Sequence, residues 1–491
     1  MSKSDSDLFL PIAMALLAAV LAIFPVSSYD VWWILAVGNH VLDGLGIPRT
    51  GIGSWTRSSE FYVYHSWGFC VIAAAAHRIG GLSGLIVLRM ILAGATFLVL
   101  TLAIVKRGAR GPSVVLFPGL ALLLGFTNLF WPVRPQSASQ ALLAVLLLFL
   151  TYLHHGRRMI FLATPFLFVL WANLHGGVIL GLIVLALHAL GDFIDRRRRL
   201  AENTTELSTQ VQVFLLSVLA CFFTPYFHGV LLSSIRHVGG TAAASAPMEW
   251  GAPKLSDFPL FIALLALAIA GVALAALSRR GRMADLLLLG LFAAMGLRSL
   301  RYLEISAIGI AYAGACVWST VLDGRIPEKI SRISGLVGAA TLALLLAMGI
   351  GRDPYFLLGG WRPLRPLPVA AVKFLAERRI TNRLANPYEW GGYLIWAFRP
   401  QNIAFVDGRA DLYTADFLRD YFTMDLGDKG WRKVLGDYSV QAILWRGGPD
   451  GANLRLNLDD DGSFVRVYTD PVAVVYLRKG GWYEHLIPAG R

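Results

Sequence analysis

Long apolar runs almost free of charged residues recur from Leu8 to Ile350, and they limit the possible folds more than any other feature. Runs of about 20 apolar residues are typical of transmembrane helices, because a helix satisfies its own backbone hydrogen bonds in hydrocarbon. Hydrophobic residues make up 56% of the 491 residues and charged residues 15%, as expected of a polytopic membrane protein. We predict eleven spans, at 8–26, 83–105, 113–131, 137–154, 159–174, 177–194, 211–226, 258–277, 284–298, 303–322 and 333–350.

The short apolar segment Gly68–Ile79 decides the topology. Its length of about 12 residues favours an interfacial or re-entrant helix over a span. If it does not cross, Lys3 and the short loops together place 16 basic residues on one side of the membrane, against 8 in longer loops on the other. The positive-inside rule then places the N-terminus inside and the C-terminus outside.

Charge and cysteine content exclude several functional classes. The net charge is +13, but residues 353–491 carry 18 Lys and Arg against 16 Asp and Glu. The basic excess therefore lies between the spans, where it sets orientation, and a nucleic-acid surface is not indicated. Cys70, Cys221 and Cys316 all fall in apolar segments, which favours buried thiols over disulfides or a metal cluster.

Three parts are expected along the chain. Residues 1–352 form the membrane domain, with a first outer loop at 27–82 that holds two juxtamembrane helices, and 353–368 form a linker. Residues 369–491 are predicted to fold as a small α/β domain. Helices are expected at Val369–Arg379, Ala415–Phe422 and Gly430–Tyr438, and strands at Ile403–Val406, Val440–Trp445, Phe464–Tyr468 and Val472–Leu477, the last two forming a hairpin.

Asp30 stands where the first span leaves the membrane, at the start of an amphipathic, Trp-rich segment. That segment is typical of a helix lying flat at the membrane interface. A carboxylate held there can act on a lipid-borne substrate, or it can cap the helix, although Ser27 or Ser28 would cap it as well.

The predicted topology gathers polar residues within apolar sequence on the outer face, while the inner loops hold little beyond arginines. Ionisable groups at membrane depth are costly and are therefore functional candidates. The set comprises Asp30, His65, Arg134, Asn173, His175, Glu249, Arg298 and Arg301, with Arg89 about six residues inside the second span. The arginines suit a phosphate diester or pyrophosphate, although they can also reach lipid headgroups.

The other candidates each have two interpretations. Glu249 is either a second carboxylate that completes a site or a solvated loop acid. Asn173 and His175, beside Gly176-Gly177, either point into an outer cavity or belong to a packing turn, and His65 is either interfacial or functional.

The most distinctive motif of the tail is NPYEWGGYLIWAF followed by FVDGRADLY. Its residues Trp390, Tyr393 and Asp407 either line a binding surface or form the core of the domain, and its glycines imply close backbone contacts.

The architecture resembles bacterial GT-C membrane glycosyltransferases, in particular relatives of the rhizobial lipopolysaccharide core enzymes. The resemblance lies in an acid, Asp30, opening the first outer loop, two juxtamembrane helices, many spans and an outer C-terminal domain. EWGGYLIW with VDGRAD is also similar, distantly, to the acceptor-binding Trp-Trp-Asp-Tyr-Gly region of oligosaccharyltransferases. The resemblance implies a bacterial inner-membrane enzyme with a periplasmic tail that uses a polyprenyl-phosphate-linked sugar.

We therefore expect an inverting glycosyltransferase whose acceptor is a lipid, glycan or protein. Asp30, with Glu249 as the second candidate, would be catalytic, and Arg134, Arg298, Arg301 and Arg89 would bind the carrier phosphate. The resemblance also suggests a divalent ion, Mg²⁺ or Mn²⁺, as a cofactor. Many relatives carry paired acids after the first span, whereas this chain has Asp30 alone, so a metal requirement does not follow from the resemblance. The alternative is a non-enzymatic lipid or polysaccharide transporter or an envelope-assembly scaffold, which would distribute ionisable groups across the membrane depth.

Overall fold

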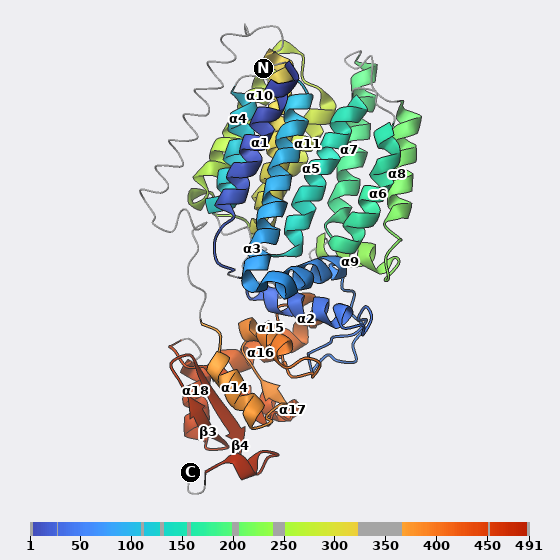
Figure 1. The fold of residues 1–491 in the computed structure, drawn as a ribbon. Helices are drawn as coiled ribbons and strands as arrows, with labels where there is room; N and C mark the ends of the chain where they lie inside the picture. The colour runs from blue at the N-terminus through green and yellow to red at the C-terminus, as the bar shows by residue number, and fades with distance from the viewer. Residues whose placement is uncertain are drawn as a thin grey trace. The chain divides into compact units, whose positions relative to one another are not determined.

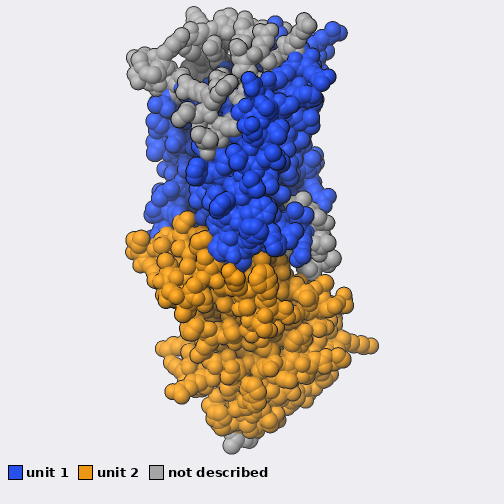
Figure 2. Space-filling view, turned by 90° about the vertical axis from the view of Figure 1, so that its right-hand side faces the viewer, with its two compact units in different colours: residues 1–26, 80–238, 247–362 blue, residues 27–79, 239–246, 363–491 orange. Residues whose placement is uncertain are grey.

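The chain divides into two compact units in the computed structural model (Figure 2). Unit 1 comprises residues 1–26, 80–238 and 247–362, and unit 2 comprises residues 27–79, 239–246 and 363–491. The structure describes residues 3–26, 28–109, 112–127, 132–154, 159–198, 206–238, 251–322, 366–449 and 452–488.

Unit 1 is a bundle of apolar helices that run side by side (Figure 1). Its helices include α1 (Lys3–Leu21), the second part of α3 (Trp67–Lys106), α4 (Ser113–Thr127), α5 (Pro135–His154), α6 (Met159–Leu174), α7 (Val178–Arg197), α8 (Leu207–Ala220), α9 (Gly229–Val238), α10 (Pro259–Ser278), α11 (Met283–Arg298) and α12 (Leu303–Leu322). The short 3₁₀ turns η3 (Leu255–Asp257) and η4 (Leu300–Tyr302) precede α10 and α12.

The helices confirm the predicted multi-pass membrane protein. Within the described residues, five helices are long and apolar enough to cross a membrane, namely those at 67–106, 135–153, 178–197, 259–278 and 300–322. Shorter apolar helices coincide with the spans predicted at 8–26, 113–131, 159–174 and 211–226, and α11 coincides with the span at 284–298. The span predicted at 333–350 lies outside the described residues.

A kink in α3 separates the short apolar segment from the following span. Gly80 and Gly81 have non-helical dihedrals, and Gly81 has a φ of 57°, which only glycine adopts readily. Residues up to Ile79 belong to unit 2, and residues from Gly80 belong to unit 1. The kink therefore separates Gly68–Ile79 from the span that follows, and the prediction that this segment does not cross the membrane stays a prediction.

Unit 2 contains the small α/β fold expected of the tail. Its sheet has the order β1-β2-β4-β3, with β1 parallel to β2 and the other pairs antiparallel. The strands are β1 (Leu384–Ala385), β2 (Ala442–Arg446), β3 (Phe464–Thr469) and β4 (Ala473–Arg478). The helices are α2 (Asp30–Leu42), α14 (Val369–Glu377), α15 (Tyr388–Ala397), α16 (Ala415–Asp425), α17 (Trp431–Asp437) and α18 (Ala452–Asp461), with 3₁₀ turns η6 (Ala410–Leu412) and η7 (Glu484–Leu486).

The structure of the tail differs from the prediction in one strand and in two additional helices. The segment predicted as a strand at Ile403–Val406 is buried but lies outside the sheet, and Ala404 makes only an isolated bridge to Ser54. The edge strand is instead Leu384–Ala385, which is too short to give an alternating pattern. Helices α15 and α18 were also not predicted.

The structure also differs from the expected domain division, because the first loop belongs to the same compact unit as the tail. The Trp55 indole donates to the carbonyl oxygen of Leu384 at 3.0 Å, and the Thr56 hydroxyl donates to that of Phe405 at 2.7 Å. The backbone of Ile403–Phe405 pairs with the loop, with the Ile403 and Ala404 amides both donating to Gly53 O at 2.9 Å. The loop thus completes the fold of the tail.

A buried ionic network occupies the C-terminal end of α7, where the sequence predicted little beyond arginines. Arg107 pairs with Asp285 at 3.0 Å, and Arg282 pairs with Asp192 at 3.3 Å. The Asp195 carboxylate accepts from the amides of Met283 and Ala284, which begin α11. The prediction that polar residues within apolar sequence gather at one face, with little beyond arginines opposite, is therefore wrong, because Asp192, Asp195 and Asp285 are buried at this end of α7 and α11.

Candidate functional site

Asp30 is the first residue of α2, and it does not occupy the N-cap position. Tyr29 occupies that position without a side-chain capping bond, and the Asp30 amide donates to the Ser28 hydroxyl at 3.3 Å. The Trp33 indole, one turn later, donates to Asp30 Oδ1 at 3.2 Å. The interpretation of Asp30 as the N-cap is therefore wrong, and its half-buried carboxylate is oriented by an aromatic donor.

Asp407 lies in the interior of unit 2, where it forms an ion pair with Arg409. The Arg409 guanidinium donates to both carboxylate oxygens at 2.7 Å, and the Tyr413 hydroxyl donates to Oδ2 at 2.6 Å. Arg409 also reaches the first loop, where it donates to Tyr64 Oη at 2.8 Å and to Ile52 O at 2.9 Å. Asp407 therefore stabilises the junction of loop and tail and is not accessible to a substrate.

The pKa values of this network follow from burial and charge. Burial alone would raise the pKa of Asp407, but the charge and hydrogen bonds of Arg409 and the hydrogen bond from Tyr413 outweigh burial and lower it. Burial raises the pKa of Tyr64 to about 12, although the nearby Arg409 opposes the shift. Both directions keep Asp407 ionised and Tyr64 protonated near neutral pH.

Trp390 and Tyr393 contribute to the hydrophobic core of unit 2. Trp390 is 2% exposed, and Tyr393 packs edge-on against Trp32 with ring centroids 5.1 Å apart. Of the two interpretations of these residues, the structure supports the core, because neither ring presents a binding surface. His65 is half-buried in the loop, and its backbone amide donates to Val63 O at 2.9 Å.

Arg89 of unit 1 is also structural. It is 1% exposed, and its guanidinium donates to Ala22 O at 2.9 Å and to Phe24 O. The guanidinium also lies 3.6 Å from the centroid of the Phe24 ring. Arg89 therefore holds the chain where it leaves α1, and the expectation that it binds a phosphate is contradicted by its burial.

The turn between α6 and α7 places Asn173 and His175 in packing roles. The Trp171 indole donates to Ser139 Oγ at 2.7 Å, and Ser139 Oγ lies 2.7 Å from His175 Nδ1. The Gly177 amide also donates to Nδ1 at 3.2 Å, so this nitrogen acts as an acceptor and we assign the ring proton to Nε2. A Cβ on Gly177 would lie 2.6 Å from Ser139 Oγ, which explains the glycine.

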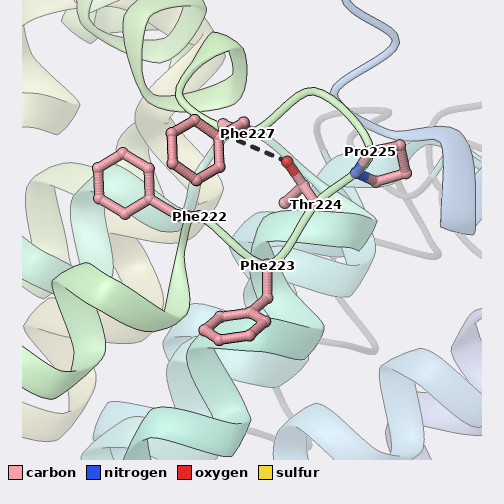
Figure 3. Close-up of a pocket in the computed structure, with 5 residues that line it drawn as sticks. All are labelled: Phe222, Phe223, Thr224, Pro225 and Phe227. Carbon is pink, nitrogen blue, oxygen red and sulfur yellow. Dashed lines mark hydrogen bonds between the residues drawn. The ribbon is translucent and has the colours of Figure 1, made fainter.

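Asn173 connects α6 to the loop after α8 and borders an apolar pocket. Its side-chain amide donates to Val169 O and to Phe223 O, both at 2.9 Å. Phe222, Phe223, Thr224, Pro225 and Phe227 line a pocket of about 490 Å³ (Figure 3). Phe227 adopts a φ of 49°, an uncommon conformation for a bulky residue, and the Thr224 hydroxyl donates to its carbonyl oxygen at 3.3 Å.

The remaining arginines lie near helix starts and ends in unit 1. Half-buried Arg134 directly precedes α5, exposed Arg298 ends α11, and exposed Arg301 lies in η4 before α12. The Gln140 amide of α5 donates to the Glu304 carboxylate of α12. Because both residues are close to the starts of their helices, Arg134 and Arg301 lie at the same end of unit 1.

Sequence reasoning missed Gln140 and Glu304. Gln140 is 2% exposed and Glu304 9% exposed, so they form a buried polar contact between two helices. Glu304 follows Arg298 and Arg301 in GLRSLRYLE and lies within the span predicted at 303–322. An acidic residue inside a predicted span is a functional candidate, and this signal could have identified Glu304. Glu249, the expected second carboxylate, lies outside the described residues.

The described residues hold no group of three or more His, Cys, Asp or Glu side chains that could bind a metal ion. Cys70, Cys221 and Cys316 are buried free thiols, as the sequence predicted.

A comparison with known protein families gives no match, and neither does a comparison with the sequences of curated proteins. Among solved structures, the chain is similar to ArnT from Cupriavidus metallidurans, which was crystallised bound to undecaprenyl phosphate. The two sequences are 13% identical, and the TM-score is 0.48. The likeness covers 97% of this chain and 98% of that chain.

Proposed function

We propose that the protein is a membrane glycosyltransferase that moves a sugar from a polyprenyl-phosphate-linked donor to an acceptor on the periplasmic face. The observation that carries the proposal is the Asp30 carboxylate, which begins an interfacial Trp-rich helix and accepts from Trp33 without capping the helix. A half-buried carboxylate held in this way suits a general base for a lipid-borne substrate. The sequence resemblance to GT-C enzymes supports the same activity.

In the proposed reaction the oxygen of the acceptor hydroxyl attacks C1 of the donor sugar, and Asp30 accepts the proton that this hydroxyl loses. The bond between C1 and the phosphate oxygen breaks, and the polyprenyl phosphate leaves with the electron pair. Because one displacement occurs, the configuration at C1 inverts. A positioned general base typically contributes about 10²–10⁴-fold to the rate.

The carrier phosphate would be bound by Arg134, Arg298 and Arg301. Arg134 and Arg301 lie at one end of unit 1, where the helix starts of α5 and α12 also carry positive partial charge. Guanidinium groups match phosphate oxygens in bidentate geometry and stabilise the negative charge that grows on the leaving group. No step is assigned to a metal ion.

The proposed location is the bacterial inner membrane, with the N-terminus in the cytoplasm and unit 2 in the periplasm. The distribution of basic residues supports this orientation. The acceptor would be a lipid, a glycan or a protein with an accessible hydroxyl or amine.

One observation favours the alternative of a transporter or assembly scaffold. Asp192 lies 14 residues after the start of α7, about 21 Å along the helix at 1.5 Å per residue. Buried ionisable groups therefore occur at both ends of unit 1, as a relay across the membrane would need.

Release of a labelled sugar separates the two functions. The purified protein in detergent is incubated with undecaprenyl phosphate carrying radiolabelled glucose, galactose, mannose or arabinose, and water or added lipid serves as acceptor. We expect release or transfer from at least one donor, and loss of that activity in Asp30→Asn with unchanged thermal stability. Binding of the donors with no turnover of any of them would support the transporter. Normal turnover by Asp30→Asn would exclude Asp30 as the base.

A further inference from the structure

Gly408 lies directly against the Asp30 carboxylate. A Cβ added at Gly408 would come under 3.0 Å from Asp30 Oδ1 and would lie 3.3 Å from the Trp33 indole nitrogen. Gly408 is not among the glycines with positive φ, so the backbone conformation does not require glycine. A Cβ at this position would displace the Asp30 carboxylate, so glycine leaves that carboxylate in its observed orientation.

Two further glycines of the tail motif bring the same segments together. A Cβ on Gly391 would come under 3.0 Å from Val406 O, and one on Gly392 would lie 3.2 Å from Tyr29 O and from the Trp33 amide. Both glycines belong to α15, which packs against α2 (Figure 1). At these glycines the start of α2, α15 and residues 406–408 therefore approach so closely that an added Cβ would require a neighbour to shift.

The segment that carries Gly408 is held on both sides by buried hydrogen bonds. Before it, the Asn386 side-chain amide donates to Val406 O at 2.9 Å, and the Phe405 amide donates to Asn386 Oδ1 at 2.8 Å. After it, Arg409 pairs with Asp407 and reaches the first loop through Tyr64. Because these groups are buried and satisfied, Gly408 has little freedom to move away from Asp30.

We propose that Gly408 and Trp33 are positioning residues that fix the orientation of the Asp30 carboxylate. Trp33 donates to Oδ1, and the Gly408 backbone closes the space on the same side. The VDGRAD segment of the tail then helps to orient the general base Asp30. This role differs from the acceptor binding that its resemblance to oligosaccharyltransferases suggests. The inference rests on the proposed function, in which Asp30 is the general base.

Gly408→Ala tests the inference, because its methyl group would force the carboxylate to turn. A displacement of about 1 Å at a catalytic group can cost roughly 10²-fold in rate, so we expect kcat to fall by about this factor. We expect Trp33→Phe to lower kcat by roughly 10-fold, about the rate equivalent of one lost hydrogen bond. The affinity for undecaprenyl phosphate and the thermal stability should stay unchanged in both variants.

Gly436→Ala is the matched control, because a Cβ there meets nothing within 4 Å. It should leave kcat and KM at the wild-type values. If Gly408 and Trp33 act through the same carboxylate, the double variant should lose less than the product of the two single losses. Fully multiplicative losses, or a Gly408→Ala variant with wild-type kcat, would overturn the inference.

Carbodiimide labelling of Asp30 provides a readout that does not need turnover. Labelling is followed by peptide mass spectrometry on the full-length protein, with exposed Asp43 of the same unit as the internal reference. Gly408→Ala and Trp33→Phe should each change the labelling rate of Asp30 relative to Asp43 by several-fold. An unchanged ratio in both folded variants refutes the positioning role, whereas an inactive wild-type protein with a changed ratio refutes only the proposed function.

Discussion

The ion pair between Asp407 and Arg409 should be the most sensitive point of unit 2. Arg409 is 2% exposed and Asp407 fully buried, so the Asp407→Asn variant leaves a buried guanidinium without its counter-charge. Removing one partner of a buried pair typically costs about 3–5 kcal/mol. At about 2–4 °C per kcal/mol for a unit of this size, the melting temperature of unit 2 should fall by roughly 6–20 °C.

The assay follows thermal unfolding of the full-length protein in detergent, with trypsin cleavage in the tail reporting on unit 2. Asp416→Asn is the control, because Asp416 and Arg419 form an ion pair at 3.1 Å in which both side chains are exposed. Exposed pairs contribute little to stability, so the control should melt like the wild type. Equal melting temperatures for the Asp407→Asn and Asp416→Asn variants would refute the assignment of Asp407 to the interior.

The pH dependence gives a second check on the same residue. Because the folded-state pKa of Asp407 lies below its ordinary value of 3.8, its contribution is present above that value and is lost as the pH falls through the folded pKa. The stability difference between the wild type and Asp407→Asn should therefore be constant above about pH 5 and narrow below about pH 4. A difference that stays constant down to pH 2 would contradict the lowered pKa.

Three further predictions concern other parts of the molecule. Arg107→Met should destabilise unit 1 by about 3–5 kcal/mol, and combining it with Asp285→Leu should restore most of the loss, as thermal unfolding can measure. Gly38→Ala should lower the melting temperature, because its Cβ would come under 3.0 Å from a carbonyl oxygen of α3, whereas Gly436→Ala should not. Because the pKa of Tyr64 is raised to about 12, its contribution to the free energy of unfolding is complete below about pH 10 and is lost as the pH rises to about 12. Denaturant unfolding at pH 9 and at pH 12 should show this loss of stability in the wild type and a smaller loss in Tyr64→Phe.

Most of the architecture could be predicted from the sequence, because the apolar runs and the helix and strand periods are local signals. The spans coincide with helices wherever the structure describes them, and the hairpin of β3 and β4 and helices α14, α16 and α17 lie close to their predicted bounds. The strand predicted at Ile403–Val406 failed because a buried apolar run does not identify its partner. Its partner is Gly53 of the first loop, some 350 residues earlier, which no local pattern reveals.

The candidate site was predictable only in part, since residue type does not distinguish accessible groups from buried ones. Arg89 was chosen as an ionisable group in apolar sequence and Asp407 as part of the tail motif, and both are committed to backbone or ion-pair partners inside the protein. Conversely, the sequence did not reveal the hydrogen bond between Gln140 and Glu304, because it forms only when α5 packs on α12. The glycines of the tail motif correctly predicted close backbone contacts, but the sequence could not indicate that Gly408 lies against Asp30.

The union of the first loop and the tail also constrains the topology. Because both belong to one compact unit, they lie on the same side of the membrane, and the intervening residues must cross it an even number of times. The ten spans predicted between 83 and 350 meet this condition, whereas a crossing by Gly68–Ile79 or the loss of one span would break it. Cysteines introduced at Ser59 and Lys479, both exposed, should therefore react with a membrane-impermeant maleimide from the same side, while the three native cysteines are buried. Labelling from opposite sides would show that the loop cannot complete the tail domain, and Asp30 would then keep Trp33 but lose Gly408 as a neighbour.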